Sequence, residues 1–456
     1  MNIHTAVIIE LSSLVRSTTL PGDAGWDAAR SSFTLSVDQT PAAVVHAESV
    51  DDVVAVVDFA RANGYRVAPQ RTGHNAAPVG DLSGSILLRT DRLTGIVIDA
   101  EARTARVQAG VQWQDIVPLA AEHGLAALAG SAPDIGIIGY TLGGGVSWHA
   151  RSLGLAANSV LSAQIVTADG VLRTIDAAHD PDLFWGIRGG GGSLGIVVSL
   201  EFRLFPITEV FAGALFWPEQ EAERVLRAWR EWTTTVPDAV TSIGRVLRFP
   251  PFPDVPEHLR GRGFVLVEAS MRLDARAGAE LLAPLRALSP EIDTFDTIPV
   301  TTLAGLHMDP TEPVPGVGHG RLLSSLDDAT LTGLADVLAG PGAHLLSVEI
   351  RHLQGALAPG AMTGGAVSGF DADFLLFAVG IGPTPDAIVG VDAAIDAVLG
   401  SVAHVTAPTT FLSFSERKMT DGELFGASID RLGRIKQTYD PNRLFQANHE
   451  ITPIAD

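Results

Sequence analysis

The spacing of apolar and polar residues predicts a mixed helix and strand fold in the first part of the chain. A helix is predicted after Ser49, because Ser49 and Asp52 have capping-box spacing and apolar residues then recur on one helical face up to Gly64. A strand is predicted over 65–69. Further apolar runs, short and at hairpin-like spacing, lie at 86–88, 96–98 and 104–109, ahead of a helix over 113–123. This arrangement is α+β and differs from a series of regular βαβ units.

The second part of the chain, from about residue 207 to 413, alternates longer strands with helices. Strands are predicted at 212–217, 263–273, 345–353 and 373–381. Helices are predicted at 219–235, 275–288 and 385–399, and a last helix at 422–438. Segments rich in proline and glycine are expected to be loops, at 249–262, 309–320 and 356–369. A sheet with helices on one side is the simplest layering.

A glycine-rich stretch at 129–158 indicates a backbone that passes close to a ligand. Gly143, Gly144 and Gly145 stand together, and apolar residues are interleaved throughout the stretch, which is not typical of a flexible linker. Free backbone N–H groups in such a segment can bind an anion, for example a pyrophosphate, without a lysine. We therefore expect the backbone of this stretch to pass very close to a ligand.

A second glycine cluster, at 190–195, matches the G-x-G-x-x-G pattern of nicotinamide-binding proteins. That pattern has physical meaning only when a helix follows it, since the phosphate binds at the N-terminus of that helix. The residues that follow, 196–204, are rich in β-branched side chains and predict a strand. We therefore reject a nicotinamide-binding Rossmann fold.

Composition excludes several classes of protein. The chain has 456 residues, a formal net charge of −21 and no cysteine. The negative charge argues against nucleic acid and anionic membranes as partners. Without cysteine, disulfides and thiolate chemistry are excluded, and no metal-ligand spacing is present. The apolar stretch at 5–14 is interrupted by Glu10 and lacks a basic region before it, so we expect a cytoplasmic protein without a signal peptide or membrane span.

Several short motifs together resemble the berberine-bridge-enzyme-like flavin-linked oxidases, which have a p-cresol-methylhydroxylase-type FAD domain. The motifs are Arg71-Thr72-Gly73-His74, Gly143-Gly144-Gly145, Asp182-Leu183-Phe184-Trp185 with Arg188-Gly189-Gly190-Gly191, and Tyr439-Asp440-Pro441-Asn442-Arg443-Leu444-Phe445. The resemblance implies an FAD domain built from 1–206 and 414–456. It also implies a substrate domain at 207–413, in which an antiparallel sheet backed by helices covers the flavin ring.

The resemblance also implies how FAD is held. The family histidine that matches His74 is bonded to the 8α carbon of the flavin. Relatives with a second tether have a cysteine where this chain has Ala132, so the chain is similar to the singly tethered branch around 6-hydroxy-D-nicotine oxidase. The residues expected to contact the cofactor are His74, Arg71, Thr72, Gly73, Asn75, Ala132, Gly136, Gly139, Thr141, Gly143, Gly144, Gly145, His149, Gly195, Ile196, Val197 and Asn448.

Candidate catalytic residues are Glu349, His352 and Tyr140. On a strand, Glu349 and Arg351 share one face and His352 lies on the other, and the sequence leaves open which face meets the flavin. A structural ion pair between Glu349 and Arg351 is the alternative to a catalytic role. The family's segment with an active-site tyrosine corresponds here to Phe411-Leu412-Ser413-Phe414, which contains no tyrosine.

Three further histidines have expected positions. His149, after the triple glycine, either lines the pocket or is a buried structural residue. His307 and His319 fall in predicted loops and are expected to face solvent.

The predicted function is an FAD-dependent oxidase that transfers a hydride from a small organic substrate to flavin N5 and is reoxidised by oxygen. The substrate is expected to be an alcohol, an amine or a secondary metabolite. A redox-neutral or cyclase-type catalyst on the same fold is the main alternative, and a non-catalytic binder is a weaker one. Monomer and homodimer both remain open.

Overall fold

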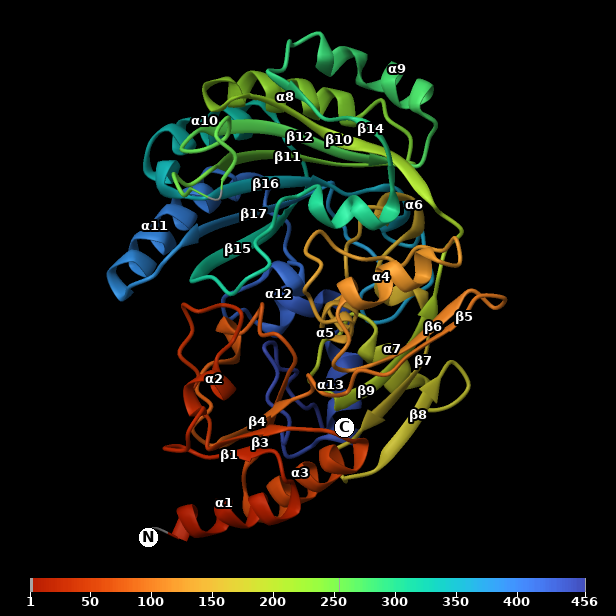
Figure 1. The fold of residues 1–456 in the computed structure, drawn as a ribbon, viewed down its shortest axis with the longest axis vertical. Coiled ribbons are helices and arrows are strands. Elements are labelled where there is room, and N and C mark those ends of the chain that lie inside the picture. Colours follow the sequence, from red (N-terminus) through yellow and green to blue (C-terminus); the bar gives the residue numbers. More distant parts are fainter. Residues whose placement is uncertain (1–2, 254, 456) are drawn as a thin grey trace.

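The computed structural model describes residues 3–253 and 255–455, which form helices packed on three sheets (Figure 1). The first sheet has the order β1(Thr18–Thr19)-β2(Ala43–His46)-β4(Ser85–Arg89)-β3(Arg66–Gln70), with β4 parallel to both β2 and β3. Helix α3 (Val50–Asn63) connects β2 to β3 and lies near α1 (Ile3–Leu14). Its predicted start and end are confirmed: Ser49 and Asp52 form a capping box, and Gly64 ends the helix with φ 75°.

The second sheet has five antiparallel strands in the order β5-β6-β9-β7-β8. Their bounds are β5 (Ile96–Asp99), β6 (Thr104–Gln108), β9 (Ile196–Arg203), β7 (Val160–Val166) and β8 (Leu172–Asp176). Strand β9 directly follows the glycine cluster at 190–195, so the rejection of a Rossmann helix there is confirmed. The apolar run at 86–88 does not join the β5–β6 hairpin. It forms part of β4, which pairs in parallel with both β2 and β3 in the first sheet.

Short helices connect the strands of these sheets. They are α2 (Trp26–Arg30), which packs on the first sheet, α5 (Ile137–Leu142) and α7 (Pro181–Ile187), which contact the second, and α4 (Trp113–Ala121) and α6 (Ala150–Leu153), of which α6 contacts β11 of the third sheet. One continuous core includes residues of α3, α4 and α7 together with β-strands of both sheets. The two smaller sheets therefore form one body.

The third sheet is antiparallel throughout and contains eight strands. The strands are β10 (Glu209–Pro218), β11 (Val240–Arg248), β12 (Gly263–Met271), β13 (Ile292–Asp293), β14 (Asp296–Pro299), β15 (Gly316–Leu323), β16 (Ser347–His352) and β17 (Phe374–Ile381). Helices α8 (Ala222–Thr233), α9 (Ala275–Arg286), α10 (Asp328–Ala339) and α11 (Pro385–Ser401) cover its outer face (Figure 1). The predicted fold class, α+β with an antiparallel sheet backed by helices, is confirmed.

Five elements of this sheet layer differ from the sequence prediction. Strands β11, β13 and β14 and helix α10 were not predicted, and β15 begins inside the segment 309–320 that was expected to be a loop. The glycines in β15 have a packing reason: a side chain at Gly318 would begin 2.5 Å from the ring of Phe377 on the neighbouring strand. Glycine in this strand therefore allows close packing and does not mark a turn.

The C-terminal segment returns to the first sheet. The predicted helix 422–438 is interrupted at Gly426, where φ is 51°, and forms α12 (Asp421–Phe425) and α13 (Ile429–Tyr439). After α13, the buried Asp440 carboxylate accepts hydrogen bonds from the amides of Leu444 (2.7 Å) and Phe445 (3.1 Å). The Tyr439–Phe445 motif is thus a turn held by an aspartate.

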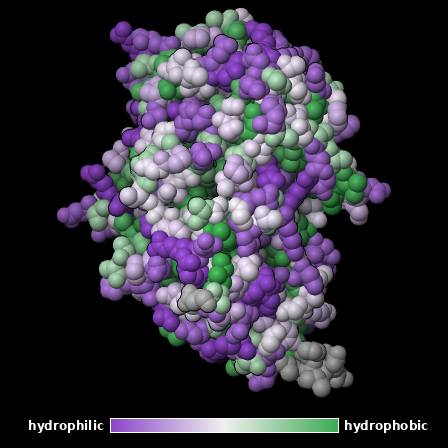
Figure 2. Space-filling view, turned by 180° about the vertical axis from the view of Figure 1, so that it is seen from behind, coloured by the Kyte–Doolittle hydropathy of each residue, from purple (hydrophilic) through white to green (hydrophobic). Residues whose placement is uncertain are grey.

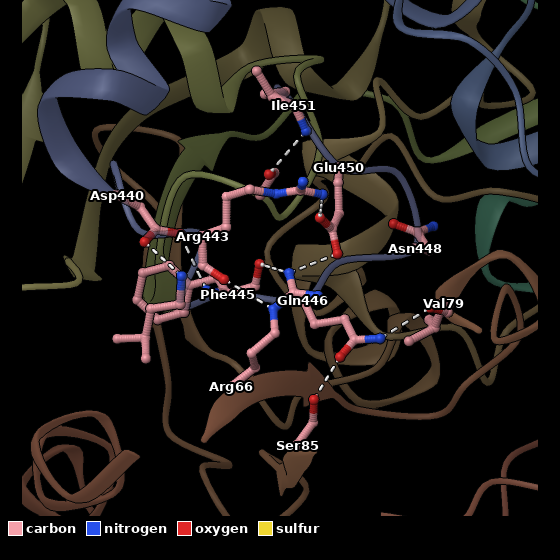
Figure 3. A network of polar contacts seen from close by, with 12 residues as sticks. Arg66, Val79, Ser85, Asp440, Arg443, Phe445, Gln446, Asn448, Glu450 and Ile451 are labelled. Atoms are coloured by element: carbon pink, nitrogen blue, oxygen red, sulfur yellow. Dashed lines mark hydrogen bonds and ion pairs between the residues drawn. The ribbon is translucent and has the colours of Figure 1, made fainter. Parts of the chain in front are cut away.

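Figure 3 shows how this turn is joined to β3 and β4. Arg66 donates to the carbonyls of Arg443 (2.8 Å) and Phe445 (2.9 Å) and pairs with Glu450 at 2.6 Å. Gln446 contacts Ser85 and donates to the Val79 carbonyl. These bonds hold the two ends of the chain together beside the cleft described below.

The surface agrees with the acidic composition. Figure 2 shows one face that is largely hydrophilic, with hydrophobic residues scattered in small groups. Within residues 3–253 and 255–455, no helix has the length and apolar character needed to cross a membrane.

Candidate functional site

A cleft of ≈ 250 Å³ lies where the first two sheets meet the C-terminal segment. The loop after β3, residues 71–75, forms one wall, and α5 with the glycines before and after it forms another. The segment 191–197 and the residues Leu412, Ser413, Ala447 and Asn448 also line it, as do Thr90 and Ala109. Parts of the sequence that lie far apart therefore converge on one space.

His74 lies in this cleft with its imidazole held on three sides. Its ring stacks on Phe33, with centroids 3.7 Å apart and planes 13° apart. Its Nδ1 is 2.8 Å from the Thr72 hydroxyl, and its Nε2 is 3.2 Å from Asp134 Oδ2. The Thr34 hydroxyl donates to the His74 carbonyl at 2.8 Å. The ring orientation is thus fixed by its neighbours.

The walls of the cleft suit a large planar cofactor with a phosphate-bearing tail. A Cβ atom added at Gly139 or Gly192 would meet nothing within 4 Å, so the space in front of both backbones is open. Asn75 donates to the carbonyls of Leu412 (3.1 Å) and Ser415 (3.3 Å), while its buried Oδ1 has no partner among the described residues. An open glycine surface beside unsatisfied polar atoms fits a bound FAD.

Most of the residues expected to contact the cofactor line this cleft. They are Arg71, Thr72, Gly73, His74, Asn75, Gly136, Gly139, Gly143, Gly195, Ile196, Val197 and Asn448. Five others do not: Ala132, Thr141, Gly144, Gly145 and His149.

For three of these five residues, the structure shows why they do not line the cleft. Gly144 and Gly145 pack against Phe411 and Tyr140, where an added Cβ would collide with the aromatic rings. His149 is buried at the N-terminal end of α6, and burial lowers its pKa to about 4, with Arg272 adding to the shift. His149 therefore fits the structural alternative better than a place in the pocket wall.

The cleft also includes residues that the sequence did not single out as cofactor contacts. They include Gln70, Thr90, Ala109, Ile138, Leu142, Gly191, Gly192, Leu412, Ser413 and Ala447. Gly191 and Gly192 belong to the glycine cluster that was rejected as a Rossmann fingerprint, and only Gly195 of that cluster was expected to contact the cofactor. Glycine lets a ligand approach the backbone closely, and Gly191 has a φ of 74°, which favours glycine. The run of glycines in the sequence could therefore have indicated that this segment contacts a ligand.

A cluster of buried charges lies on the inner face of the third sheet. Glu349 Oε1 accepts from Arg351 Nε at 2.7 Å, and Glu349 Oε2 is 2.6 Å from His307 Nε2. The other imidazole nitrogen of His307 is 2.6 Å from Glu268 Oε2. The side chains of His307, Glu268 and Glu349 are 3%, 0% and 4% exposed, so one imidazole bridges two carboxylates away from bulk water.

Opposite charges set the protonation states in this cluster. For His307, burial and Arg245 lower the pKa, but the carboxylates of Glu268, Asp309 and Glu349 outweigh them and raise it to about 9. Burial alone would raise the pKa of Glu349, yet Arg351 and His307 hold it well below its usual range. The cluster therefore contains an imidazolium and an ionised Glu349 at neutral pH.

The cluster adjoins the cleft. The Arg351 guanidinium lies 4.8 Å from the ring centre of Phe414, directly after the cleft residues Leu412 and Ser413. Asp309, close to His307 in sequence, accepts from the Ser131 hydroxyl at 2.8 Å, which joins the large sheet to the segment before α5. Glu349 and Arg351 share one face of β16, as the strand periodicity predicts.

Two expectations about histidines are wrong. His307 and His319 were expected to face solvent, but each is only 2% exposed. His307 is held between two carboxylates, and His319 belongs to β15, where burial lowers its pKa to about 4. Both errors have one cause. The exposure of the two histidines was predicted from the local composition of their segments, whereas contacts with residues distant in sequence bury them.

The other two catalytic candidates have different surroundings. His352 stacks on Phe374 and contacts Gln354 at 3.1 Å, on the strand face that Val348 and Ile350 bury beneath the helices. The Tyr140 hydroxyl donates to the Leu128 carbonyl at 3.1 Å, and burial raises its pKa. Tyr140 lines the cleft, whereas His352 does not and lies with Arg351 along a separate, much smaller cavity.

Within residues 3–253 and 255–455, no group of three or more His, Asp or Glu side chains has the arrangement needed to hold a metal ion.

Comparisons with known proteins agree with this geometry. Residues 41–176 match the family "FAD binding domain", and residues 411–452 match the family "Berberine and berberine like". These two segments contain the His74 loop, α5 and both C-terminal parts of the cleft lining. The fold and cleft thus define an FAD-linked protein.

Individual relatives support the same class. The chain is 34% identical over 212 residues to the FAD-linked oxidoreductase hasG of Aspergillus fumigatus, and 33% identical over 204 residues to (R)-6-hydroxynicotine oxidase of Paenarthrobacter nicotinovorans. These matches cover 45% and 44% of this chain, and the same shares of the two relatives, so the chain matches less than half of each relative's length.

A solved structure extends the likeness in fold to the whole chain. The berberine-bridge-enzyme-like protein 1 of Physcomitrella patens superposes with a TM-score of 0.86 at 19% sequence identity, over 99% of this chain and 100% of that one. The two family matches and this likeness in fold agree with the motifs of the sequence: the chain contains an FAD-binding domain and a C-terminal segment that matches berberine-like proteins.

Proposed function

We propose that this protein is an FAD-dependent oxidase that oxidises a small organic substrate and passes the electrons to oxygen. The observation that carries the proposal is the cleft, in which the loop 71–75 and the glycines around α5 lie within the segment that matches the FAD-binding family. The charge cluster beside it supplies ionised, buried side chains of the kind that enzymes use for proton transfer.

We further propose that His74 is the single covalent link to the flavin, through the 8α carbon. His74 lines the cleft and its ring is held in one orientation by Phe33 and Thr72. No cysteine exists in the chain, and the position of the second tether in related proteins is Ala132. A singly tethered FAD follows from these features.

When bound, FAD supplies a hydride acceptor and a route for electrons to oxygen. We assign the acceptance of the substrate proton to Glu349, because it is ionised and lies on the sheet face that adjoins the cleft. Arg351 and His307 each bond one oxygen of Glu349 and fix its direction. His352, on the opposite strand face, does not share this role.

The proposed substrate class is supported by the name of one relative, whereas other relatives are named oligosaccharide oxidases. One relative is named for the oxidation of (R)-6-hydroxynicotine and another is named an FAD-linked oxidoreductase. A small amine, alcohol or secondary metabolite fits this group.

Oxygen consumption tests the proposed reaction. The purified, yellow protein is mixed with a panel of amines and alcohols that includes (R)-6-hydroxynicotine, and flavin absorbance is followed without oxygen and then with it. Bleaching by at least one substrate, followed by recovery with one peroxide per turnover, is expected. Product formation without oxygen uptake would favour the redox-neutral alternative. A flavin that binds ligands tightly but is reduced by none of them would favour a binder.

A further inference from the structure

Asp134 lies beside the proposed flavin tether, and its carboxylate is paired with His74. The Asp134 side chain is 9% exposed, and its Oδ2 is 3.2 Å from His74 Nε2. Its Oδ1 is buried and has no hydrogen-bond partner among the described residues, and the same holds for His74 Nε2. Buried polar atoms are seldom left unpaired without a reason, so this pair calls for a functional explanation.

The two edges of the His74 ring face different surroundings. Nδ1 points to Thr72, which lines the cleft, whereas Nε2 points to Asp134, which does not. Phe33 covers one face of the ring and restricts its tilt. A bond from His74 to a ligand in the cleft therefore forms most directly at Nδ1, with Nε2 left facing the carboxylate.

Imidazole chemistry gives this arrangement a consequence. When one ring nitrogen forms a new bond to carbon, positive charge develops on the ring until the other nitrogen loses its proton. A carboxylate at that second nitrogen orients the ring and stabilises the charge, as the aspartate does in a Ser-His-Asp triad. Here it can in addition accept the proton that the ring must lose, a step that the triad aspartate does not perform.

We propose that Asp134 is the residue that activates His74 for covalent flavin attachment. Nδ1 forms a bond to the flavin 8α carbon, which loses one C–H bond. The Nε2 proton moves to Asp134 and on to solvent. The electron pair and the proton of the broken C–H bond stay on the flavin, which is left two-electron reduced with one added proton. Dioxygen, together with one proton from solvent, then oxidises it to complete the attachment, with hydrogen peroxide as the product. This inference rests on the proposed covalent link at His74.

The sequence context is consistent with a dedicated role. Asp134 stands two residues after Ala132, and Ala132 is the residue at the position of the second link in doubly tethered relatives. The backbone carbonyl of Asp134 accepts from the side chain of Gln112, which anchors the segment independently of its carboxylate. A change of the carboxylate alone therefore leaves the position of this segment supported.

The test measures attachment of FAD and does not depend on turnover. Apoprotein produced under riboflavin limitation is mixed with FAD in air, and the covalently modified fraction is followed by intact mass and by flavin fluorescence in denaturing gels. For Asp134→Asn, we expect attachment slowed on the order of 100-fold, as for loss of a general base, with non-covalent FAD still bound. Asp115→Asn is the matched control, because Asp115 caps α4 through the Gln112 amide, and it should attach FAD at the wild-type rate.

A second variant separates proton transfer from a purely structural effect. Asp134→Ala leaves space beside His74, so added formate or acetate should restore part of the attachment rate. Slow attachment that no small carboxylate restores, in a variant that holds FAD, would contradict the proposal, as would Asp134→Asn at the wild-type rate. If wild type itself attaches no FAD, the covalent link fails before the role of Asp134 is reached. The two failures are therefore distinguishable.

Discussion

The cleft and the charge cluster are adjacent but are built in opposite ways. The cleft presents glycine backbone, open space and unsatisfied polar atoms such as Asn75 Oδ1. In the cluster, both carboxylate oxygens of Glu349 and both nitrogens of His307 have partners. The difference indicates that the cleft is completed by a cofactor, whereas the cluster is complete in itself and positions one reactive group.

The largest expected effect concerns that reactive group. Glu349→Gln keeps the size of the side chain but removes its capacity to accept a proton, so flavin reduction by substrate should slow by roughly 100-fold or more. Flavin attachment should stay intact, because Glu349 belongs to the cluster and His74 to the cleft. Anaerobic stopped-flow reduction measures the rate, and reduction near the wild-type rate would make Glu349 structural.

A second change tests whether the cluster is self-sufficient. Glu268→Gln removes one of the two carboxylates that flank His307 and leaves buried charge without its partner, which costs about 3 kcal/mol of unfolding free energy. Urea unfolding of the FAD-loaded protein measures this loss. Arg276→Gln on the exposed face of α9 is the control, since its pair with Glu280 is open to solvent and should contribute under about 1 kcal/mol. Equal effects of both changes would mean that burial does not strengthen the cluster.

The protonation state of His307 makes the free energy of unfolding depend on pH in a defined direction. Its pKa is raised from 6.5 to about 9 in the folded protein, so the folded state binds this proton more tightly than the unfolded state. The resulting stabilisation is fully present below pH 6.5 and is lost as the pH rises through about 9. In His307→Gln, the free energy of unfolding should change less with pH over this range. A variant with the same loss between pH 6.5 and 9 as wild type would show that another group is responsible.

The smallest effects distinguish the two kinds of glycine in the cleft region. Gly145 has a φ of 76°, and an added methyl group there would collide with the ring of Tyr140. Gly145→Ala should therefore lower the unfolding free energy by about 2 kcal/mol. Gly139→Ala meets open space and should change stability by less than about 0.5 kcal/mol. It should nevertheless weaken non-covalent FAD retention, because the methyl group enters the cleft. Unchanged retention would show that FAD does not pass over Gly139.

The same contrast explains how much the sequence could predict. Helix α3 was predictable because its capping box and glycine stop are local, and the cleft was predictable because its glycines and the His74 loop form short contiguous motifs. The cluster was only half predictable. Strand alternation placed Glu349 beside Arg351, but His307 and Glu268 come from segments distant in sequence, and no local pattern brings them together.

Missed secondary structure has the same origin. Gly318 in β15 was interpreted as a loop residue, although it is required by the ring of Phe377 on the adjacent strand. Pairing between strands that are distant in sequence decided the structure there, and it overrode local propensity.

Acid precipitation of the purified protein tests the central claim most directly, namely that this cleft holds FAD through a single bond to His74. Wild-type precipitate should stay yellow and fluorescent after washing, and a digest should yield one flavin-bearing peptide that contains His74. His74→Ala should release all of its flavin into the supernatant. Colourless precipitate from fully loaded wild type, or flavin retained by His74→Ala, would contradict the account.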